Sequence, residues 1–368
     1  MLVFVVQLSE CIPSMFTNEV TQNNTNLKIT LTKLGVRSFI NSCIKNIVEM
    51  ASRINFPDMS GSIGPFNVQI SDIAFTDIQV NNFDFILAKA SSIQVNQIDV
   101  HAEFTLKVVQ NSWPYTQVNT RASINIQNAG IRTIAIFKES QDCPGHLEFN
   151  TENFVLDFER FSFQSDIYLA DMLAPMFGEF FKQFLTAPLV RAFENRVNLY
   201  LQSYRGQIEF GNDIADQRLF KMDIDPQYIS VQMSGLSSYY QEKYASMKKL
   251  QENYSNDEIN YAVGKAVFCQ IFDSAFGDEA QQLIIVNLGI SVLIKNELYT
   301  FKVQPEFGFI ESEMNEERRV MLLKLTSGNE ELDQKLNAKP YYIFDAIFVG
   351  NVRTVYRDEA VVLFAEFE

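Results

Sequence analysis

The sequence has little tryptophan, histidine, cysteine, glycine or proline. Its 368 residues include one Trp, two His, four Cys, 15 Gly and 10 Pro. The low Gly and Pro content excludes collagen-like and low-complexity chains. The cysteines match no zinc or CxxC spacing, and we interpret them as free or buried thiols, with a disulfide as the alternative. They are Cys11, Cys43, Cys143 and Cys269.

Long apolar runs and basic clusters are also lacking. No window reaches 18 apolar residues, so no transmembrane helix is predicted. The net charge is −15, and the absence of a basic run argues against a nucleic-acid partner and against a polybasic membrane tether. The acidic excess is −5 in residues 1–203 and −10 in residues 204–368.

Common catalytic motifs are missing as well. The sequence contains no G-x-S-x-G elbow, P-loop or HExxH. His101 and His146 occur in strand-like polar contexts without a neighbouring nucleophile or metal-ligand pattern, so we expect both on the surface. We therefore predict a protein that is not an enzyme and that needs no metal or cofactor.

The chain opens with a short apolar run from Met1 to Leu8, followed by Ser9-Glu10-Cys11, which has the form of a cleavage site. Sequons at Asn23 and Asn253 suit a secreted glycoprotein. We assign residues 1–26 as a signal peptide and leader, and expect a protein that is secreted or in the endomembrane lumen. The alternatives are a first strand or a truncated gene start, and if the run is not a signal peptide we expect a cytoplasmic protein.

What is abundant is apolar residues, at 47%, with 32 Phe. Apolar residues recur at helical spacing over residues 31–53 and 168–203, and Pro188 predicts a kink or break in the second helix. From Phe66 to Val108 the period is two, but successive apolar pairs start five residues apart, so their phase flips. Such flips indicate bulges, sharp turns or a strongly coiled sheet. Asn128-Ala129-Gly130 is a candidate turn.

The second half repeats the mixture of helix and strand. A strand pair is predicted at 219–235, a helix at 256–275, and strands over 281–326 and 341–367. Residues 327–339 form a charged connection. The pattern as a whole predicts an α+β fold with antiparallel strands.

Several segments of the chain carry a family resemblance. The first is Leu31-Thr32-Lys33-Leu34-Gly35-Val36 followed by a helix and then by the junction Asn55-Phe56-Pro57-Asp58-Met59-Ser60-Gly61. This order is similar to the opening of the family of bactericidal/permeability-increasing, lipopolysaccharide-binding and lipid-transfer proteins. Residues 125–131 resemble its central hairpin, and 176–202 its long second helix. In the second half, 220–225 and 255–262 are similar to the opening and first helix of the second domain.

The resemblance implies two tandem tubular lipid-binding domains in a boomerang shape, each a twisted antiparallel sheet wrapped on a long helix. The domains would be residues 27–203 and a shortened 215–368, joined by a linker at 204–214. The flipping phase would give the sheet two apolar surfaces, one on the helix and one lining a groove. The family's link from Cys143 to the long helix is expected to be missing, because 168–203 contain no Cys.

The resemblance implies binding or transfer of phospholipid or another acyl-chain lipid, with transient membrane contact and a role in host defence or lipid sensing. Lipopolysaccharide is doubtful as a ligand, because no cluster of Lys and Arg is visible. The alternatives are a protein-interaction module with a filled core, and an intracellular lipid-exchange module. The candidate lipid-binding residues, which would otherwise fill a solid core, are Phe39, Cys43, Ile47, Ile73, Phe75, Ile78, Val80, Phe83, Ile93, Val95, Ile98, Val100, Met172, Met176, Phe177, Phe180 and Phe184.

Overall fold

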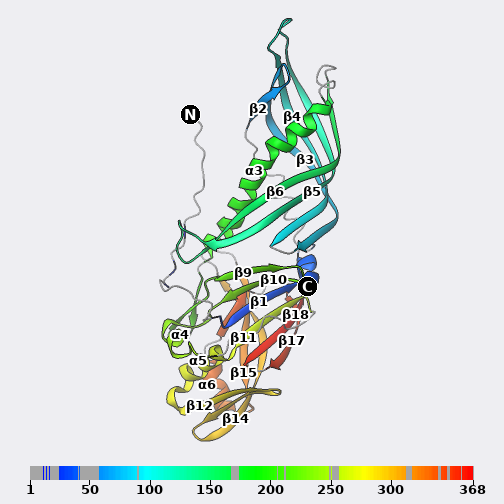
Figure 1. The fold of residues 1–368 in the computed structure, drawn as a ribbon. Coiled ribbons are helices and arrows are strands. Elements are labelled where there is room, and N and C mark those ends of the chain that lie inside the picture. The colour runs from blue at the N-terminus through cyan, green and yellow to red at the C-terminus, as the bar shows by residue number, and fades with distance from the viewer. Residues whose placement is uncertain are drawn as a thin grey trace. The chain divides into compact units, whose positions relative to one another are not determined.

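A computed structural model describes two compact units, each discontinuous in sequence (Figure 1). Unit 1 comprises Met1–Phe39, Phe137–Glu148 and Leu199–Glu368, and unit 2 comprises Ile40–Ile136 and Phe149–Asn198. No helix in the described part of the chain is long and apolar enough to cross a membrane. The described residues are 11, 14, 16, 25–39, 41, 58–88, 91–166, 174–204, 206–210, 213–247, 250, 257–311, 317–338, 341–345, 349–357 and 359–367.

Unit 2 is an antiparallel sheet of very long strands with one long helix packed against it. The sheet order follows the chain, β2-β3-β4-β5-β6. Four of these strands are 19 or 23 residues long, whereas strands of about five or six residues are usual. The elements are β2 (Met59–Ile63), β3 (Phe66–Ala88), β4 (Ser92–Gln110), β5 (Gln117–Glu139), β6 (Leu147–Ser165) and α3 (Ala174–Ser203).

The changes of apolar phase noted in the sequence between Phe66 and Val108 correspond to bulges in the sheet. The pairing of β3 with β4 shifts register between Ser71 and Ala74, between Phe75 and Asp77, and between Val80 and Asp84. Residues opposite each other in a ladder share a face, so the shifts can be followed through cross-strand partners. On the face that meets α3, these are Val68 with Val108, Ile70 with Leu106, Phe75 with Ala102, and Ile78 with Val100. The bulges therefore keep successive apolar pairs on one face, which corrects the prediction of two apolar surfaces.

The candidate turn at residues 128–130 is wrong, because β5 runs through it without a break. Asn128 has a φ of 51° and its backbone N–H donates to Asp99 Oδ1 at 2.7 Å. The register of β4 with β5 shifts at this level, between Ile98 and Val100. An Asn in the left-handed conformation is found in bulges as well as in turns. Because β5 continues on both sides of Asn128, the residue forms a bulge here.

The predicted helix at 168–203 is present from Ala174 to Ser203 and continues through Pro188, so the predicted break is absent. Leu185 and Leu189, on the two sides of Pro188, both pack against the sheet. Burial on both sides offsets the backbone hydrogen bond that proline cannot donate. Of the predicted helix at 31–53, Leu31 and Thr32 are instead the end of a strand, residues 33–39 and 41 are helical, and the rest lie outside the described residues.

Unit 1 contains two antiparallel sheets. The first has the order β17-β18-β11-β1-β10-β9 and the second the order β12-β13-β14-β15-β16. Their strands are β1 (Leu27–Thr32), β9 (Lys221–Asp225), β10 (Tyr228–Met233), β11 (Ile259–Gly264), β12 (Ala280–Val286), β13 (Gly289–Ile294), β14 (Glu297–Glu311), β15 (Glu317–Thr326), β16 (Tyr341–Asp345), β17 (Val349–Arg357) and β18 (Ala360–Phe367). A small pair is formed by β7 (Gln207–Phe210) and β8 (Asp213–Asp216). The helices of this unit are α4 (Ser238–Lys243), α5 (Lys265–Phe276), the 3₁₀ turn η2 (Gly277–Glu279) and α6 (Glu330–Asn337).

The predicted helix at 256–275 is wrong in its first part, where the structure has the strand β11. All six residues of β11 are buried, because the strand lies between β1 and β18 in the sheet. A strand that is buried on both faces has a continuous run of apolar residues. The spacing of those residues does not distinguish such a strand from a buried helix. The predicted connection at 327–339 contains α6, whose N-terminus is capped by the Asn329 side chain accepting from the Leu332 N–H at 3.3 Å.

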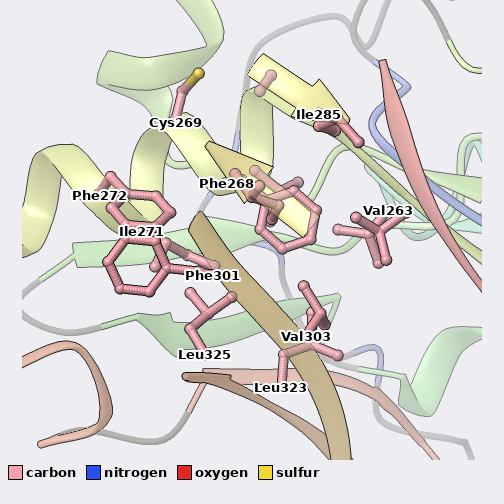
Figure 2. Packing of buried hydrophobic residues seen from close by; sticks show 14 of the residues in the cluster. Val263, Phe268, Cys269, Ile271, Phe272, Ile285, Phe301, Val303, Leu323 and Leu325 are labelled. Carbon is pink, nitrogen blue, oxygen red and sulfur yellow. The ribbon is translucent and has the colours of Figure 1, made fainter. Parts of the chain in front are cut away.

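The core of unit 1 surrounds α5 (Figure 2). Phe268 and Phe272 are almost fully buried, and the Phe272 ring meets Phe301 of β14 edge-on at 4.9 Å between centroids. Val303, Leu323 and Leu325 complete this wall from β14 and β15 (Figure 2). Unit 1 is therefore held by a large apolar core of its own.

Two contacts fix residues near the N-terminus to the rest of unit 1. Cys11 forms a disulfide with Cys143, so the interpretation of these two cysteines as free thiols is wrong, whereas Cys269 is free and buried. The Arg218 guanidinium donates to the Phe16 carbonyl at 2.9 Å and forms a buried ion pair with Asp216 at 2.8 Å. Cys143 is thus bonded to the N-terminal segment and not to the long helix.

The compact units differ from the domain boundaries predicted by the resemblance. β1, from the predicted first domain, pairs with β10 and β11 of the second half and belongs to unit 1. Residues 137–148, which include the end of β5, the connection and the start of β6, also belong to unit 1. β1 and β10 lie about 200 residues apart in the sequence. Pairing between such distant strands gives no local sequence pattern from which a domain boundary could be predicted.

Candidate lipid-binding face

A cluster of phenylalanines joins α3 to the sheet of unit 2. Phe177 and Phe181 of α3 are 0% and 1% exposed. The Phe177 ring stacks on Phe163 of β6 at 4.6 Å between centroids, and the Phe181 ring lies 5.4 Å from Phe104 of β4. Because helix and sheet side chains interdigitate at ring-contact distances, this part of the interface is solid.

The same apolar face continues away from the cluster as a strip of half-buried residues. Val68, Ile70 and Leu106 are at most 1% exposed, whereas the members of the strip are of intermediate exposure. These apolar side chains are covered only in part, and four of them, Ile73, Phe75, Ile98 and Val100, pack against the buried core. We call this the half-buried strip, and its residues are Ile73, Phe75, Ile78, Ile93, Val95, Ile98 and Val100.

The charged side chains of β4 lie on the other face. Since side chains alternate across a strand, Asp99, His101 and Glu103 of β4 face away from Ile98, Val100 and Ala102. His101 is half-buried on this polar face. At the margin of the cluster, Lys182 of α3 reaches Asp157 of β6 at 3.4 Å and lies over the Phe158 ring. The electrostatics of the strip are therefore those of an uncharged apolar surface, suited to hydrocarbon.

The structure brings some of the candidate residues together. Phe177 belongs to the buried cluster, and Ile73, Phe75, Ile98 and Val100 pack against it. Ile78 lies opposite Val100, while Ile93 and Val95 lie on β4 beyond the Gln97 bulge.

The remaining candidate residues are not placed at this strip. Phe39 lies in unit 1, where its ring is 5.8 Å from that of Phe367. Two candidates, Val80 and Phe83, lie on β3, and three, Met176, Phe180 and Phe184, lie on α3. The structure describes the backbone of these five residues and not their side chains. Cys43, Ile47 and Met172 lie outside the described residues.

Sequence reasoning missed two side chains that fasten α3 to the edge strand β6. Asn198 accepts from the Phe149 N–H at 2.6 Å and donates to the Phe149 carbonyl at 2.9 Å. Glu194 accepts from the Thr151 N–H at 2.7 Å and from its hydroxyl at 2.8 Å. Four helical residues rise about 6 Å and two strand residues about 7 Å. Helix side chains at this spacing can therefore bind the backbone of an edge strand.

Among the described residues, the titratable groups with perturbed pKa values belong to unit 1, whereas the strip belongs to unit 2. Burial and a hydrogen bond to Asp273 raise the pKa of Tyr244, and the bond to Asp273 also raises that of Lys243. His146, predicted on the surface, is 5% exposed and its Nε2 lies 2.9 Å from the Tyr204 carbonyl oxygen. That prediction is wrong because the ring finds backbone partners that sequence spacing does not reveal.

Comparison with known proteins places this fold. No family model and no curated protein matches the chain. Among solved structures, lipopolysaccharide binding protein matches with a TM-score of 0.57 at 10% identity, covering 94% of this chain and 99% of that chain. Takeout 1 of Epiphyas postvittana (TM-score 0.33, 10% identity, 46% of this chain and 91% of that one) and P47 of Clostridium botulinum E1 (TM-score 0.29, 9% identity, 94% and 99%) match more weakly.

Only the first of these matches bears on the fold, since TM-scores below 0.5 do not establish one. The chain has a fold like that of lipopolysaccharide binding protein, mostly sheet with few helices. The resemblance found in the sequence is therefore confirmed at the level of the fold.

Proposed function

We propose that this protein binds lipids by burying their acyl chains along the half-buried strip of unit 2, next to α3. The supporting observation is that an apolar face continues from a solid core into partly covered residues while its charges lie on the other face. Each methylene buried there contributes about 0.8 kcal/mol. Binding therefore needs no charged contact, and a net charge of −15 does not oppose it.

The phenylalanine cluster limits where an acyl chain can lie. Phe104, Phe163, Phe177 and Phe181 fill the helix–sheet interface at their end of the sheet. A chain that enters must lie beyond them, along Ile73, Phe75, Ile98 and Val100. This arrangement favours one acyl chain or a few over a large cargo.

The same cluster supports the second candidate function, a protein-interaction module whose core is filled. In that case the half-buried strip is packed by the protein itself and takes no ligand. Lipid content separates the two functions directly.

The proposed compartment is oxidising, as in a secreted protein or one of the endomembrane lumen. The Cys11–Cys143 disulfide supports this, because structural disulfides are rare in the cytosol. A mature chain would retain Cys11, so any cleavage would precede it. Host defence by capture of lipopolysaccharide is the less favoured role, since an anionic ligand would meet an acidic protein.

The first test is native mass spectrometry of the purified full-length protein, followed by organic extraction and lipid identification. We expect bound phospholipid or another acyl-chain lipid at defined stoichiometry. A protein that is free of lipid, and that takes up none from vesicles, would contradict the proposal and favour the interaction module.

A pair of variants tests the location. Ile98→Trp fills the strip, and His101→Trp adds the same ring to the polar face of the same strand. We expect Ile98→Trp to lower the lipid bound per chain at least severalfold and His101→Trp to leave it unchanged, with melting temperatures checked for both. Equal lipid content in the two variants would place the ligand elsewhere.

A further inference from the structure

The apolar face of β4 changes from solid to partly covered between two successive positions. Ala102 and Phe104 are 0% and 3% exposed, and the next two residues on this face, Leu106 and Val108, are as deeply buried. On the other side of the change, Val100 is only half-buried. The half-buried strip therefore ends abruptly on this strand, at the level of Ala102.

Rings from three elements close the face just beyond this level. The Phe104 ring lies 5.4 Å from Phe181 of α3 and 6.3 Å from Phe163 of β6, measured between centroids. Phe163 in turn stacks on Phe177 of α3. Side chains packed at such distances leave no room for a hydrocarbon chain between them. An acyl chain that follows β4 toward Phe104 must therefore stop there.

The other end of the strip is polar. Beyond Ile93 the strand begins at Ser92, and Ser91 precedes it with a φ of 56°. The Ser91 carbonyl accepts from the Ala135 N–H at 2.9 Å, which fixes this end of β4 to β5. Because burial of an unpaired polar group is costly, the polar end of a lipid is favoured at these serines and its terminal methyl at the rings. The two ends of the strip thus give an acyl chain a direction.

The length of the strip sets the length of the chain that fills it. Ile93 and Val100 are separated by a bulge at Gln97, and at about 3.3 Å per residue they are roughly 20 Å apart. Carbon–carbon bonds of about 1.5 Å advance an extended hydrocarbon by roughly 1.25 Å each. A straight chain of about 16 carbons therefore fills the strip from its closed end to Ile93.

We propose that Phe104 and its ring partners are the stop of a length-selective site for a single acyl chain. The chain lies along β4 with its terminal methyl at Phe104 and its polar end near Ser92. The inference rests on the proposed function and deepens it, because it names the ligand class as lipids with a straight chain of about 16 carbons. Phe104 is then the residue that determines specificity.

Competition from vesicles tests the length limit. Full-length protein is incubated with phosphatidylcholine vesicles that contain equal small amounts of saturated monoacyl phosphatidylcholines, with even-numbered chains from 12 to 22 carbons. The protein is then re-isolated, and its bound lipid is extracted and quantified by mass spectrometry.

Chains up to the limit leave one apolar environment for another, so we expect them on the protein in similar amounts. Each methylene beyond the limit stays in water, at a cost of about fourfold in binding. We therefore expect chains of 20 and 22 carbons to be at least roughly tenfold scarcer on the protein than the 16-carbon chain. Equal amounts of the 16- and 22-carbon chains would overturn the proposal, and so would uptake of diacyl lipid alone.

Variants should move the limit in opposite directions. Phe104→Ala removes a ring from the stop, so we expect the limit to lengthen by about two to four carbons. Ile93→Trp fills the polar end and should shorten it. Val108→Ala is the matched control, because it removes buried apolar volume from the same face of the same strand on the far side of Phe104, and it should leave the limit unchanged. A limit that stays in Phe104→Ala, or that moves in Val108→Ala, would overturn the assignment of the stop.

Melting temperatures are measured for each variant, because Phe104→Ala deletes a buried ring. If it does not fold, Phe104→Leu makes the same change in a smaller step. Ile93→Trp acts at a half-buried position and tests the other end of the strip. An unchanged limit in both of these variants would contradict the proposal.

The lipid content of the parent protein distinguishes failure of this inference from failure of the proposed function. If the parent carries acyl-chain lipid and shows no length limit, the stop is wrong and lipid binding stands. If the parent carries no lipid and takes up none from the vesicles, the proposed function itself fails. A length limit that lengthens in Phe104→Ala supports both.

Discussion

The thiol of Cys269 in α5 is buried, and its pKa is raised. Desolvation is the main cause that raises the pKa of this thiol from its ordinary value of 9.0 to about 12. The thiol therefore stays protonated in the folded protein through neutral and mildly alkaline pH. Such a cysteine packs as a small apolar residue and is a poor nucleophile.

We predict that Cys269 makes stability fall between pH 9 and 12. Above pH 9 the unfolded chain loses this proton and the folded chain keeps it, so the unfolded state is favoured by up to about 1.4 kcal/mol per pH unit. Tyr244, whose pKa burial also raises, acts in the same direction. Free energies of unfolding measured from pH 7 to 11 should decline less steeply in Cys269→Ala than in the parent. Identical slopes would contradict the assignment.

At the scale of elements, β6 is an edge strand that the helix completes. An edge presents a row of unpaired backbone groups to solvent and to other chains. Asn198 and Glu194 occupy part of that row at Phe149 and Thr151. The helix therefore serves both as one wall of the candidate lipid site and as a cover for the edge of the sheet.

We predict that Asn198→Ala lowers the free energy of unfolding by roughly 1–3 kcal/mol, because it removes two hydrogen bonds to a buried residue of β6. Asn195→Ala, on the exposed side of the same helix, is the matched control and should change stability by less than about 0.5 kcal/mol. Urea denaturation measures both, and hydrogen exchange at Phe149 and Thr151 should quicken only in the first. Equal effects of the two substitutions would contradict a role for this bond.

Elements with one apolar face were predicted best. Two apolar residues separated by one polar residue, such as Val68 and Ile70, predict a strand. That prediction does not depend on the bulge that follows them. Which face the next pair joins depends on cross-strand pairing, so the single apolar face of β3 was not predicted. β11 was missed for the related reason that it is buried on both sides. The exposure of Trp113 could not be predicted, because it depends on the conformation of the turn between β4 and β5.

At the scale of the whole molecule, one covalent bond spans 132 residues of sequence. The Cys11–Cys143 loop contains β1 of unit 1 and most of the sheet of unit 2. In the chain-entropy account, a crosslink that closes a loop of about 100 residues raises the free energy of unfolding by on the order of 4–5 kcal/mol. The bond therefore stabilises the folded molecule mainly by restricting the unfolded one.

We predict that Cys11→Ser lowers the free energy of unfolding by about 2–5 kcal/mol. Reductant should have a similar effect on the parent and little effect on the variant. Cys269→Ala should keep the sensitivity to reductant, since Cys269 is a free thiol. Denaturation curves of the three proteins with and without dithiothreitol test this. A parent unaffected by full reduction would show that the bond contributes nothing.

The place of β1 in the sheet has a consequence for biosynthesis. β1 is made first, yet its two neighbours are β10 and β11, and residues 33–258 must be translated before β11 begins. At about 5–20 residues per second, this leaves Leu27, Ile29 and Leu31 without their sheet for roughly 10–45 s. During that interval the nascent chain presents an unpaired apolar strand at its leading end. We expect this strand to need protection from aggregation until the second half of the chain has been made.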